Sequence, residues 1–249
     1  MHHLKGILTI VLLVLLSGNI LAQRSKKEKL EDFTFGVQFK PLIPVNYFGI
    51  EDKVLTDTIA EINVDAKFGY SLGMVMRRNF SSKFSLETGI NYTRRNYNII
   101  SNEFIRDTAD KADFGFVTYE FPIEALFYIR LTDQLYMNTA AGFGINYFAS
   151  DVQSVGENFL IQQITTRVRW MDFTLLANLG FEFRTEEKGN FYLGASLVNP
   201  FRDLMFTRIN YYYENNKYQQ YQTNLRGNYL TLDLRYFFPV IEKEVKVLK

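Results

Sequence analysis

The stretch Thr118-Tyr-Glu-Phe-Pro-Ile-Glu-Ala-Leu-Phe-Tyr-Ile-Arg-Leu131 separates apolar from polar side chains at every second residue. Its odd-numbered positions are all apolar or aromatic, whereas its even-numbered positions include Glu120, Glu124 and Arg130. Side chains alternate between the two faces of a β-strand, so one face of this strand is apolar over its whole length. An unbroken apolar face opposite ionic groups is typical of a barrel wall that separates lipid from a polar interior.

Seven other segments show the same alternation. They lie at about residues 33–43, 66–77, 84–95, 135–147, 171–184, 191–197 and 230–238. Short polar connections at 79–83, 132–134 and 185–190 alternate with long ones at 44–65, 99–114, 150–167 and 204–228. This spacing predicts an all-β fold, namely an eight-stranded antiparallel transmembrane β-barrel over residues 33–239 with short periplasmic turns and long extracellular loops.

Aromatic residues gather toward the two ends of these segments, which predicts two girdles at the two membrane interfaces. The alternative is that aromatic residues simply favour strands. The expected turn-end girdle consists of Phe33, Phe80, Phe84, Tyr136, Phe191, Tyr236 and Phe238. The expected loop-end girdle consists of Tyr47, Phe48, Tyr70, Tyr92, Phe116, Tyr147 and Trp170.

The N-terminal residues have the features of an export signal. Lys5 precedes an apolar run from Ile7 to Leu16, and the small residue Ala22 follows at the expected cleavage point. The run is shorter than the roughly 18 to 20 residues that a spanning helix needs, which argues against an uncleaved anchor. We therefore expect a cleaved signal peptide at 1–22, a periplasmic lead at 23–32, a periplasmic tail at 240–249, and a mature protein in the outer membrane of a Gram-negative bacterium.

The composition argues against catalysis. The chain has no Cys, and both of its histidines, His2 and His3, lie in the expected signal peptide. The mature chain therefore lacks the histidine base on which serine and cysteine nucleophiles rely. We expect no enzyme, no catalytic residue, no cofactor and no metal ligand. A carboxylate-only calcium site at Asp107, Asp110 and Asp113 lacks the full loop pattern, so solvated loop charge explains these residues better.

Export would leave a mature chain without net charge. Removal of residues 1–22 takes away one charged residue, Lys5, so that 27 of the 28 basic residues remain against 27 acidic residues. Nucleic-acid binding calls for a basic surplus or a basic stripe. We therefore expect outer-membrane lipid, and no nucleic acid, among the partners.

The polar faces of the strands carry a nearly balanced set of charged side chains. An eight-stranded barrel has room for side chains in its interior and for little else, and charges removed from water have to be paired. We therefore expect a lumen plugged by an ionic network, with a proton or ion path as the alternative. The expected members are Lys40, Arg77, Glu87, Arg95, Glu120, Glu124, Arg130, Asp172, Glu182, Arg184, Asp233 and Arg235.

One long connection is rich in tyrosine. Tyrosine is enriched at binding surfaces because it combines a large contact area with a polar tip. Asn215-Asn216, at the centre of this connection, fits a two-residue hairpin turn. The tyrosines therefore form a candidate interaction surface, and the alternative is a cross-strand ladder that stiffens the hairpin. They are Tyr211, Tyr212, Tyr213, Tyr218 and Tyr221.

Three segments carry a resemblance to known proteins. Phe84-Ser-Leu-Glu-Thr-Gly-Ile-Asn-Tyr92, Tyr119-Glu-Phe-Pro-Ile123 and Tyr229-Leu-Thr-Leu-Asp-Leu-Arg-Tyr236 resemble the PorT-like small outer-membrane β-barrel families of Bacteroidota. The resemblance extends from about Val64 to Pro239 and implies a membrane barrel. Some members of these families serve protein secretion across the outer membrane, so the resemblance also implies an accessory subunit of a secretion complex as an alternative function.

These features together predict a small non-enzymatic outer-membrane barrel of the cell envelope. We expect it to act as a structural or surface-interaction protein through its long loops, with a protein partner there or in a secretion complex. A further alternative is a secreted lipocalin-like barrel whose apolar face turns inward around a ligand. Lysine is scarce in the strands, which would leave such a barrel without a charged exterior and argues against it.

Overall fold

The computed structural model of the chain describes residues 33–44, 53–185, 187–214 and 217–239. The chain divides into two units, Met1–Leu30 and Glu31–Lys249, and all of the described residues belong to the second. The expected signal peptide, lead and tail lie outside the described residues, as do Tyr47, Phe48 and Asn215-Asn216. Within the described part of the chain, no helix is long and apolar enough to cross a membrane.

The second unit is built from antiparallel β-strands. In chain order they are β1 (Phe33–Ile43), β2 (Lys53–Thr56), β3 (Ala60–Asn79), β4 (Phe84–Glu103), β5 (Ala109–Arg130), β6 (Leu135–Phe148), β7 (Val152–Val155), β8 (Ile161–Arg167), β9 (Met171–Arg184), β10 (Asn190–Pro200), β11 (Met205–Tyr213), β12 (Lys217–Leu225) and β13 (Tyr229–Phe237).

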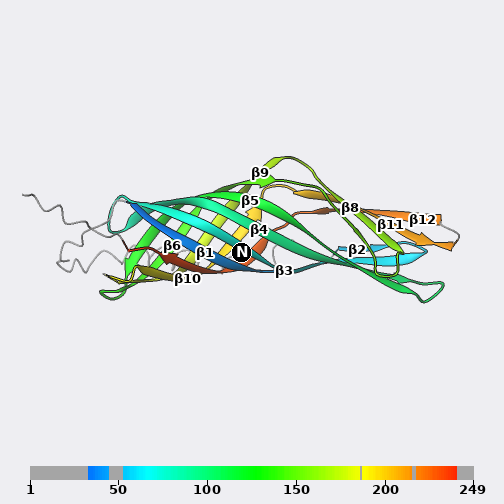
Figure 1. Cartoon of the computed structure of the whole chain (residues 1–249), viewed down its shortest axis with the longest axis horizontal. Coiled ribbons are helices and arrows are strands. Elements are labelled where there is room, and N and C mark those ends of the chain that lie inside the picture. The colour runs from blue at the N-terminus through cyan, green and yellow to red at the C-terminus, as the bar shows by residue number, and fades with distance from the viewer. Residues whose placement is uncertain (1–32, 45–52, 186, 215–216, 240–249) are drawn as a thin grey trace, which may run out of the picture. The chain divides into compact units, whose positions relative to one another are not determined.

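Eight of these strands form a closed ring (Figure 1). The nine-stranded sheet has the order β1-β13-β10-β9-β6-β5-β4-β3-β2, and an additional pairing of β1 with β3 closes it, which leaves only β2 outside. The closing pair runs in unbroken register from Phe33 opposite Arg78 to Leu42 opposite Gly69. The predicted all-β, antiparallel fold is confirmed, and the predicted number of strands agrees with this ring.

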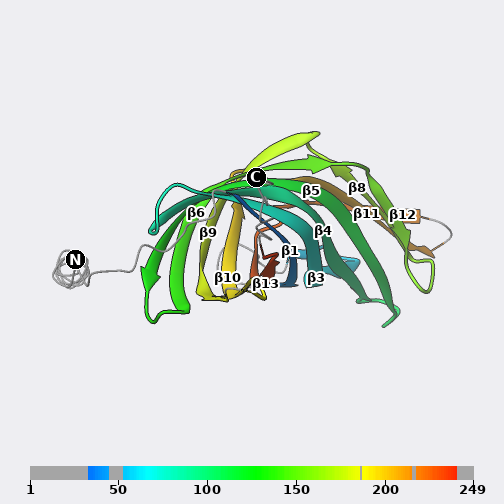
Figure 2. The ribbon, with the colours of Figure 1, turned by 60° about the vertical axis from the view of Figure 1, so that its left-hand side comes forward.

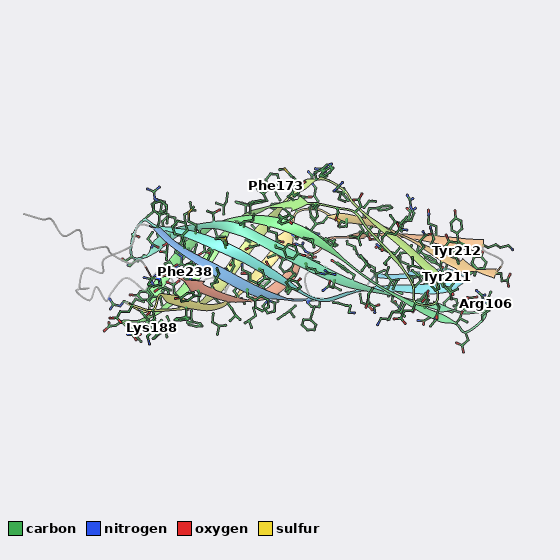
Figure 3. All side chains as sticks on the ribbon, in the orientation of Figure 1. Arg106, Phe173, Lys188, Tyr211, Tyr212 and Phe238 are labelled. Atoms are coloured by element: carbon green, nitrogen blue, oxygen red, sulfur yellow. The ribbon has the colours of Figure 1, made fainter. Side chains whose placement is uncertain are left out.

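Alternation places the apolar side chains outside the ring and the polar side chains inside. On β9, Phe173 and Leu175 are exposed, whereas Thr174 and Asn178 are buried. Figure 3 shows Phe173 on the outer side of the ribbon. The lipocalin-like alternative requires the opposite arrangement, with the apolar face inside, and does not agree with the structure.

The polarity of both faces reverses part-way along β4. As far as Arg95 the side chains that face the lumen are polar or glycine, but beyond it Tyr97 and Ile99 are buried. The outer face changes at the same level from the aromatic Tyr92 to the charged Arg94. An apolar interior with a polar exterior is the arrangement of a protein in water, so β4 passes from one kind of surroundings to another.

A β-bulge marks the same level on β3. The register between β3 and β4 shifts between Lys67 and Tyr70. Before the shift in chain order, Ile62 and Val64 are buried, whereas after it Leu72 is exposed. An extra residue in one strand exchanges the faces of the side chains that follow it. The bulge therefore lets one strand serve both surroundings.

Aromatic side chains lie at both ends of the apolar outer surface. At the reversal of polarity, the ring centroids of Tyr70 and Tyr92 are 6.3 Å apart, those of Tyr92 and Tyr119 are 6.0 Å apart, and Trp170 lies 6.3 Å from Tyr147. At the turn end a second set makes ring contacts, namely Phe80, Phe84, Phe127, Phe191, Tyr236 and Phe238. Of the residues expected in the girdles, Phe116 and Tyr136 are instead buried.

Beyond the ring, the long connections form further strands rather than irregular loops. A second sheet, in the order β12-β11-β8-β7, lies beyond the ends of β6, β9 and β10 (Figure 2). Its core is shared with the far ends of β3, β4 and β5 and includes Ile62, Ile99, Phe114, Ile161 and Ile209. We call this part, residues 53–67, 96–117, 151–168 and 204–225, the loop extension.

Three strands are consequently much longer than predicted. β3, β4 and β5 contain 20, 20 and 22 residues, and β5 begins at Ala109 rather than near Thr118. The segments predicted as loops contain enough apolar residues to build a core of their own. Once such a core exists, extended strands that pair with one another satisfy their backbone hydrogen bonds better than a loop does.

The closure of the ring can be tested with cysteines, because the chain has none of its own. Val37 and Met74 lie opposite one another in the pairing of β1 with β3, and both are exposed. A variant with Val37→Cys and Met74→Cys should therefore form a disulfide in the folded protein. Gel mobility with and without reductant measures the cross-link.

Val37→Cys combined with Ile90→Cys is the matched control. Ile90 lies opposite Met74 on the next strand, which places it two strand spacings from Val37, about 10 Å and beyond disulfide reach. A cross-link in the control pair, or none in the first pair, would contradict the closure of the ring at β1 and β3.

Candidate functional site

An ionic network fills the ring near its short turns. Arg77 of β3 lies between two carboxylates, with Glu87 of β4 at 3.1 Å and Glu182 of β9 at 2.6 Å. Arg184 binds the other oxygen of Glu182 at 2.7 Å. The ion pair between Arg77 and Glu182 joins strands that are not neighbours in the ring. It therefore connects opposite walls across the lumen.

The network continues through β13 and β1. Arg235 pairs with Glu87 and, at 2.7 Å, with Asp233. Asp233 also accepts a hydrogen bond from the Ser196 hydroxyl at 2.6 Å and lies 3.4 Å from the ammonium of Lys40. Every carboxylate of this group thus has at least one cation beside it, as buried charges require. We call the group the turn-side network, which consists of Lys40, Arg77, Glu87, Glu182, Arg184, Asp233 and Arg235.

A separate ion pair lies nearer the loop extension. Arg95 of β4 binds Glu120 of β5 at 2.9 Å, and the Tyr229 hydroxyl lies 2.9 Å from each oxygen of Glu120. The guanidinium of Arg95 also donates to the Thr118 hydroxyl at 2.5 Å and to the Gly227 carbonyl at 3.3 Å. Both members of the pair therefore have several hydrogen-bond partners, which lowers the cost of burying them. We call Arg95 and Glu120 the loop-side pair.

A cavity of about 20 Å³ lies between these two groups, and we call it the central chamber. Lys40 of the turn-side network and Glu120 of the loop-side pair both line it. Glu124 lines it as well, and this residue is opposite Glu87 in the register of β4 and β5. The side chains of the turn-side network and of the loop-side pair therefore fill the lumen on either side of this small space.

Two expected members of the ionic network lie apart from it. Arg130 is the last residue of β5 and lies at the exposed turn, where it binds Asp133 at 2.5 Å. Arg130 is still paired with the inward-facing Tyr136, but at the mouth of the ring its side chain reaches solvent. Asp172 is buried on β9, but its carboxylate accepts the backbone N–H of Phe173 at 2.7 Å, and no ion pair to it is found among the described residues.

The five tyrosines of the long connection are divided between two faces of the hairpin formed by β11 and β12. Tyr211 and Tyr221 are buried in the core of the loop extension, and Tyr213 packs against that core. Tyr212 and Tyr218 lie on the other face, with ring centroids 5.6 Å apart. The expected tyrosine surface is therefore reduced to this one pair, because strand alternation turns the others inward.

No pattern in the sequence singles out Glu103, which holds the far end of the loop extension together. Its carboxylate is buried at the end of β4 and accepts the Tyr211 hydroxyl at 2.8 Å and two N–H groups of Arg106, each at 2.8 Å. The hydrogen bonds from Arg106 hold the pKa of the Glu103 carboxyl below its usual range. Burial, together with the bond to Glu103, raises the pKa of Tyr211 to about 12.

Asp110 ties two turns of the loop extension together. Its carboxylate accepts the backbone N–H groups of Asn158, Leu160 and Ile161 at 2.8, 2.9 and 3.0 Å. This carboxylate is thus used for structure, whereas Asp113 binds Lys67 at 3.0 Å. Within the described ranges no cluster of acidic, His or Cys side chains could hold a metal ion.

The far end of the loop extension exposes apolar side chains. Phe104 and Ile105 lie in the turn between β4 and β5, and Phe159 lies in the neighbouring turn between β7 and β8. Phe159 is 79% exposed and Ile105 is 73% exposed. We call residues 104–108 and 156–160 the distal turns. Figure 3 shows Arg106 at this end and Lys188 and Phe238 at the opposite end.

Residues 22–239 match the family described as outer membrane protein beta-barrel domain. The chain belongs to this family. The closed ring with its apolar outer face is therefore an outer-membrane β-barrel domain, and the family supports a location in the outer membrane.

Among solved structures, the chain is similar to the transport unit of the autotransporter AIDA-I from Escherichia coli, with 8% sequence identity and a TM-score of 0.28. The similarity covers 92% of this chain and 96% of that one. No curated protein matches the sequence.

Removal of one central cation should show how much the barrel depends on its ionic network. Arg77→Leu leaves the carboxylates of Glu87 and Glu182 with one fewer cation each, so we expect it to lower the free energy of unfolding by about 3 to 5 kcal/mol. Urea titration in lipid vesicles, followed by the fluorescence of the single tryptophan, Trp170, measures this.

Arg130→Leu is the matched control. It removes an ion pair of the same kind, but at an exposed turn where solvent screens the charges, so we expect a loss of less than about 1 kcal/mol. Equal losses in the two variants would mean that the position of Arg77 in the lumen has no special importance.

The pKa shifts of Glu103 and Tyr211 predict the pH range in which the loop extension is most stable. The lowered pKa of Glu103 gives stabilisation that is present above the ordinary carboxyl range, about pH 4.3, and is lost as the pH falls. The raised pKa of Tyr211 gives stabilisation that is present below about pH 10 and is lost as the pH rises through about 12. At pH 7 both contributions are complete.

At pH 7, Tyr211→Phe should therefore weaken the loop extension by about 1.5 to 3 kcal/mol, because it removes a hydrogen bond to a buried carboxylate. Tyr212→Phe, which removes a bond to the half-buried Gln162 at 2.9 Å, should cost about 1 kcal/mol or less. Amide hydrogen exchange in β11 measures both. A larger effect of Tyr212→Phe would contradict the assignment of the two faces.

Proposed function

We propose that this protein is a small non-enzymatic outer-membrane barrel that acts at the cell surface through its loop extension. The observation that supports this most is the second core. β3, β4 and β5 continue beyond the aromatic side chains of Tyr70, Tyr92 and Tyr119. There they join β8 and β11 around buried apolar side chains. A folded structure outside the barrel has a defined surface, which irregular loops do not provide.

The proposal also includes the orientation of the barrel in the outer membrane. The two sets of aromatic side chains bound the apolar outer surface. Phe84 and Tyr92 on β4 are separated by about 27 Å along the strand. At the usual strand tilt of about 35 to 45° this is about 20 Å along the barrel axis, which is of the same order as the roughly 25 Å apolar band of such barrels. Short periplasmic turns and long extracellular connections are the usual arrangement. We therefore place the short turns in the periplasm and the loop extension outside the cell, with export by a signal peptide at 1–22.

The distal turns are the part of the loop extension best suited to contact a partner protein. Apolar side chains that are exposed to water together mark interaction sites, and Phe104, Ile105 and Phe159 are not needed for the core. On the side of the hairpin, the exposed Tyr218 and the half-buried Tyr212 add an aromatic pair.

A second candidate function follows from the plugged lumen. A barrel filled by ion pairs has no room for a polypeptide, so a role in secretion would be that of an accessory subunit beside a separate channel. The resemblance to PorT-like proteins of Bacteroidota supports this candidate, and a partner bound at the periplasmic turns rather than at the distal turns would favour it.

A pull-down in detergent from the native host, followed by mass spectrometry, distinguishes the two functions. Ile105→Asp with Phe159→Asp should remove the partner of a surface-interaction protein. Lys188→Asp, in the turn between β9 and β10, is the matched control and should leave that partner bound. The reverse pattern would exclude the surface role and support the accessory subunit.

The plugged lumen predicts a low permeability. Because ion pairs cross the ring and the central chamber has a volume of only about 20 Å³, the purified barrel should show no stable porin-like conductance in planar bilayers. A porin reconstituted in the same bilayers is the positive control. A large and stable unit conductance would contradict the arrangement of the lumen described above.

A further inference from the structure

The central chamber is lined by polar groups that the protein itself leaves without partners. Asn146 of β6 lines it, is 1% exposed, and has no hydrogen-bond partner for either its Nδ2 or its Oδ1 within the described residues. Ordered water satisfies a buried amide of this kind where a polar space large enough to hold the water adjoins the side chain. Asn146 therefore points to a ligand that can both donate and accept hydrogen bonds.

Glu124 gives a second and independent indication. Its side chain is 4% exposed, yet no hydrogen bond or ion pair to its carboxylate is found among the described residues. It also lies opposite another carboxylate, Glu87, whose own oxygens are bound by Arg77 and Arg235. A buried carboxylate in this position needs donors, and the chamber is the space from which they can come.

The charge of the lumen argues against an anionic ligand. The turn-side network, the loop-side pair, Glu124 and Asp172 together contain five cations and six anions. A cation cannot accept a hydrogen bond from Nδ2 of Asn146, so the ligand that fits is neutral. The volume of about 20 Å³ exceeds the roughly 10 to 15 Å³ that one water molecule needs, and it excludes a larger organic ligand.

We infer that the central chamber is a binding site for ordered water, held by Glu124 and Asn146. The water donates to the Glu124 carboxylate and to Oδ1 of Asn146, and it accepts from Nδ2 of Asn146. Lys40 of the turn-side network lines the same chamber, and its ammonium can donate to the second lone pair of the water. Glu124 is thereby connected to the cations of the lumen through water instead of by direct contact.

The molecule contains a matched internal control. Asn138 lies on the same strand, is also 1% exposed, and also has neither amide atom hydrogen-bonded within the described residues. It does not line the chamber. If burial alone brought water to unpartnered amides, the two residues would behave alike.

Rotating-frame cross-relaxation between water and side-chain amide protons, measured by NMR on the full-length protein in detergent micelles, tests the inference. Asn146→Leu and Asn138→Leu assign the two signals, because each variant loses one of them. We expect a cross-peak between water and the Asn146 amide and none to the Asn138 amide. No cross-peak at Asn146, or equal cross-peaks at both residues, would overturn the inference.

A variant that fills the chamber supplies the second measurement. Thr174 lines the chamber, and Thr174→Leu adds volume there, so we expect the cross-peak at Asn146 to disappear while the remaining spectrum is retained. A cross-peak of unchanged intensity in this variant would overturn the inference. Should Thr174→Leu fail to fold, Ser196→Leu fills the chamber from β10, and the comparison of Asn146 with Asn138 in the unsubstituted protein remains decisive.

Discussion

The pairing of β1 with β3 is the constraint on which the rest of this structure depends. In lipid no water is present to satisfy an unpaired backbone, so a sheet can cross only if its two edges meet. The closure fixes the number of strands in the ring and with it the width of the lumen. A lumen of this width has to be filled by side chains, and alternation dictates that these are the polar ones.

The ionic network is therefore a consequence of closure as well as a support for it. Arg77 and Glu182 come from strands far apart in the sequence and on different sides of the ring. Their contact is possible only when the ring is complete, and the complete ring is stable only when these charges are paired. The pair of Arg95 and Glu120 likewise joins β4, β5 and the connection before β13, and it forms only when these segments have come together.

The alternation of apolar and polar side chains predicted the ring and its two faces well. A period of two is a local property of the chain and can be read within one segment. The alternation predicted Arg77, Glu87 and Glu182 as lumen residues for the same reason. It failed for Arg130, since the end of a strand is not visible in the alternation itself. It also failed for Phe116, Tyr211 and Glu103, because these face a core that exists only after distant connections have come together. No pattern within one segment reveals whether its apolar residues will meet lipid or each other.

The reversal of polarity along β4 specifies the register of this strand twice over. A slip by one residue would turn Ile99 into water and Arg95 into lipid at the same time, so both halves of the strand oppose it. A slip by two residues keeps every side chain on its face, yet it would carry Tyr92 and Arg94 about 7 Å along the strand and across the interface. A strand that is amphipathic in the same way along its whole length would tolerate the slip by two residues. The change of surroundings within a single strand thus fixes the position of the barrel along the membrane normal.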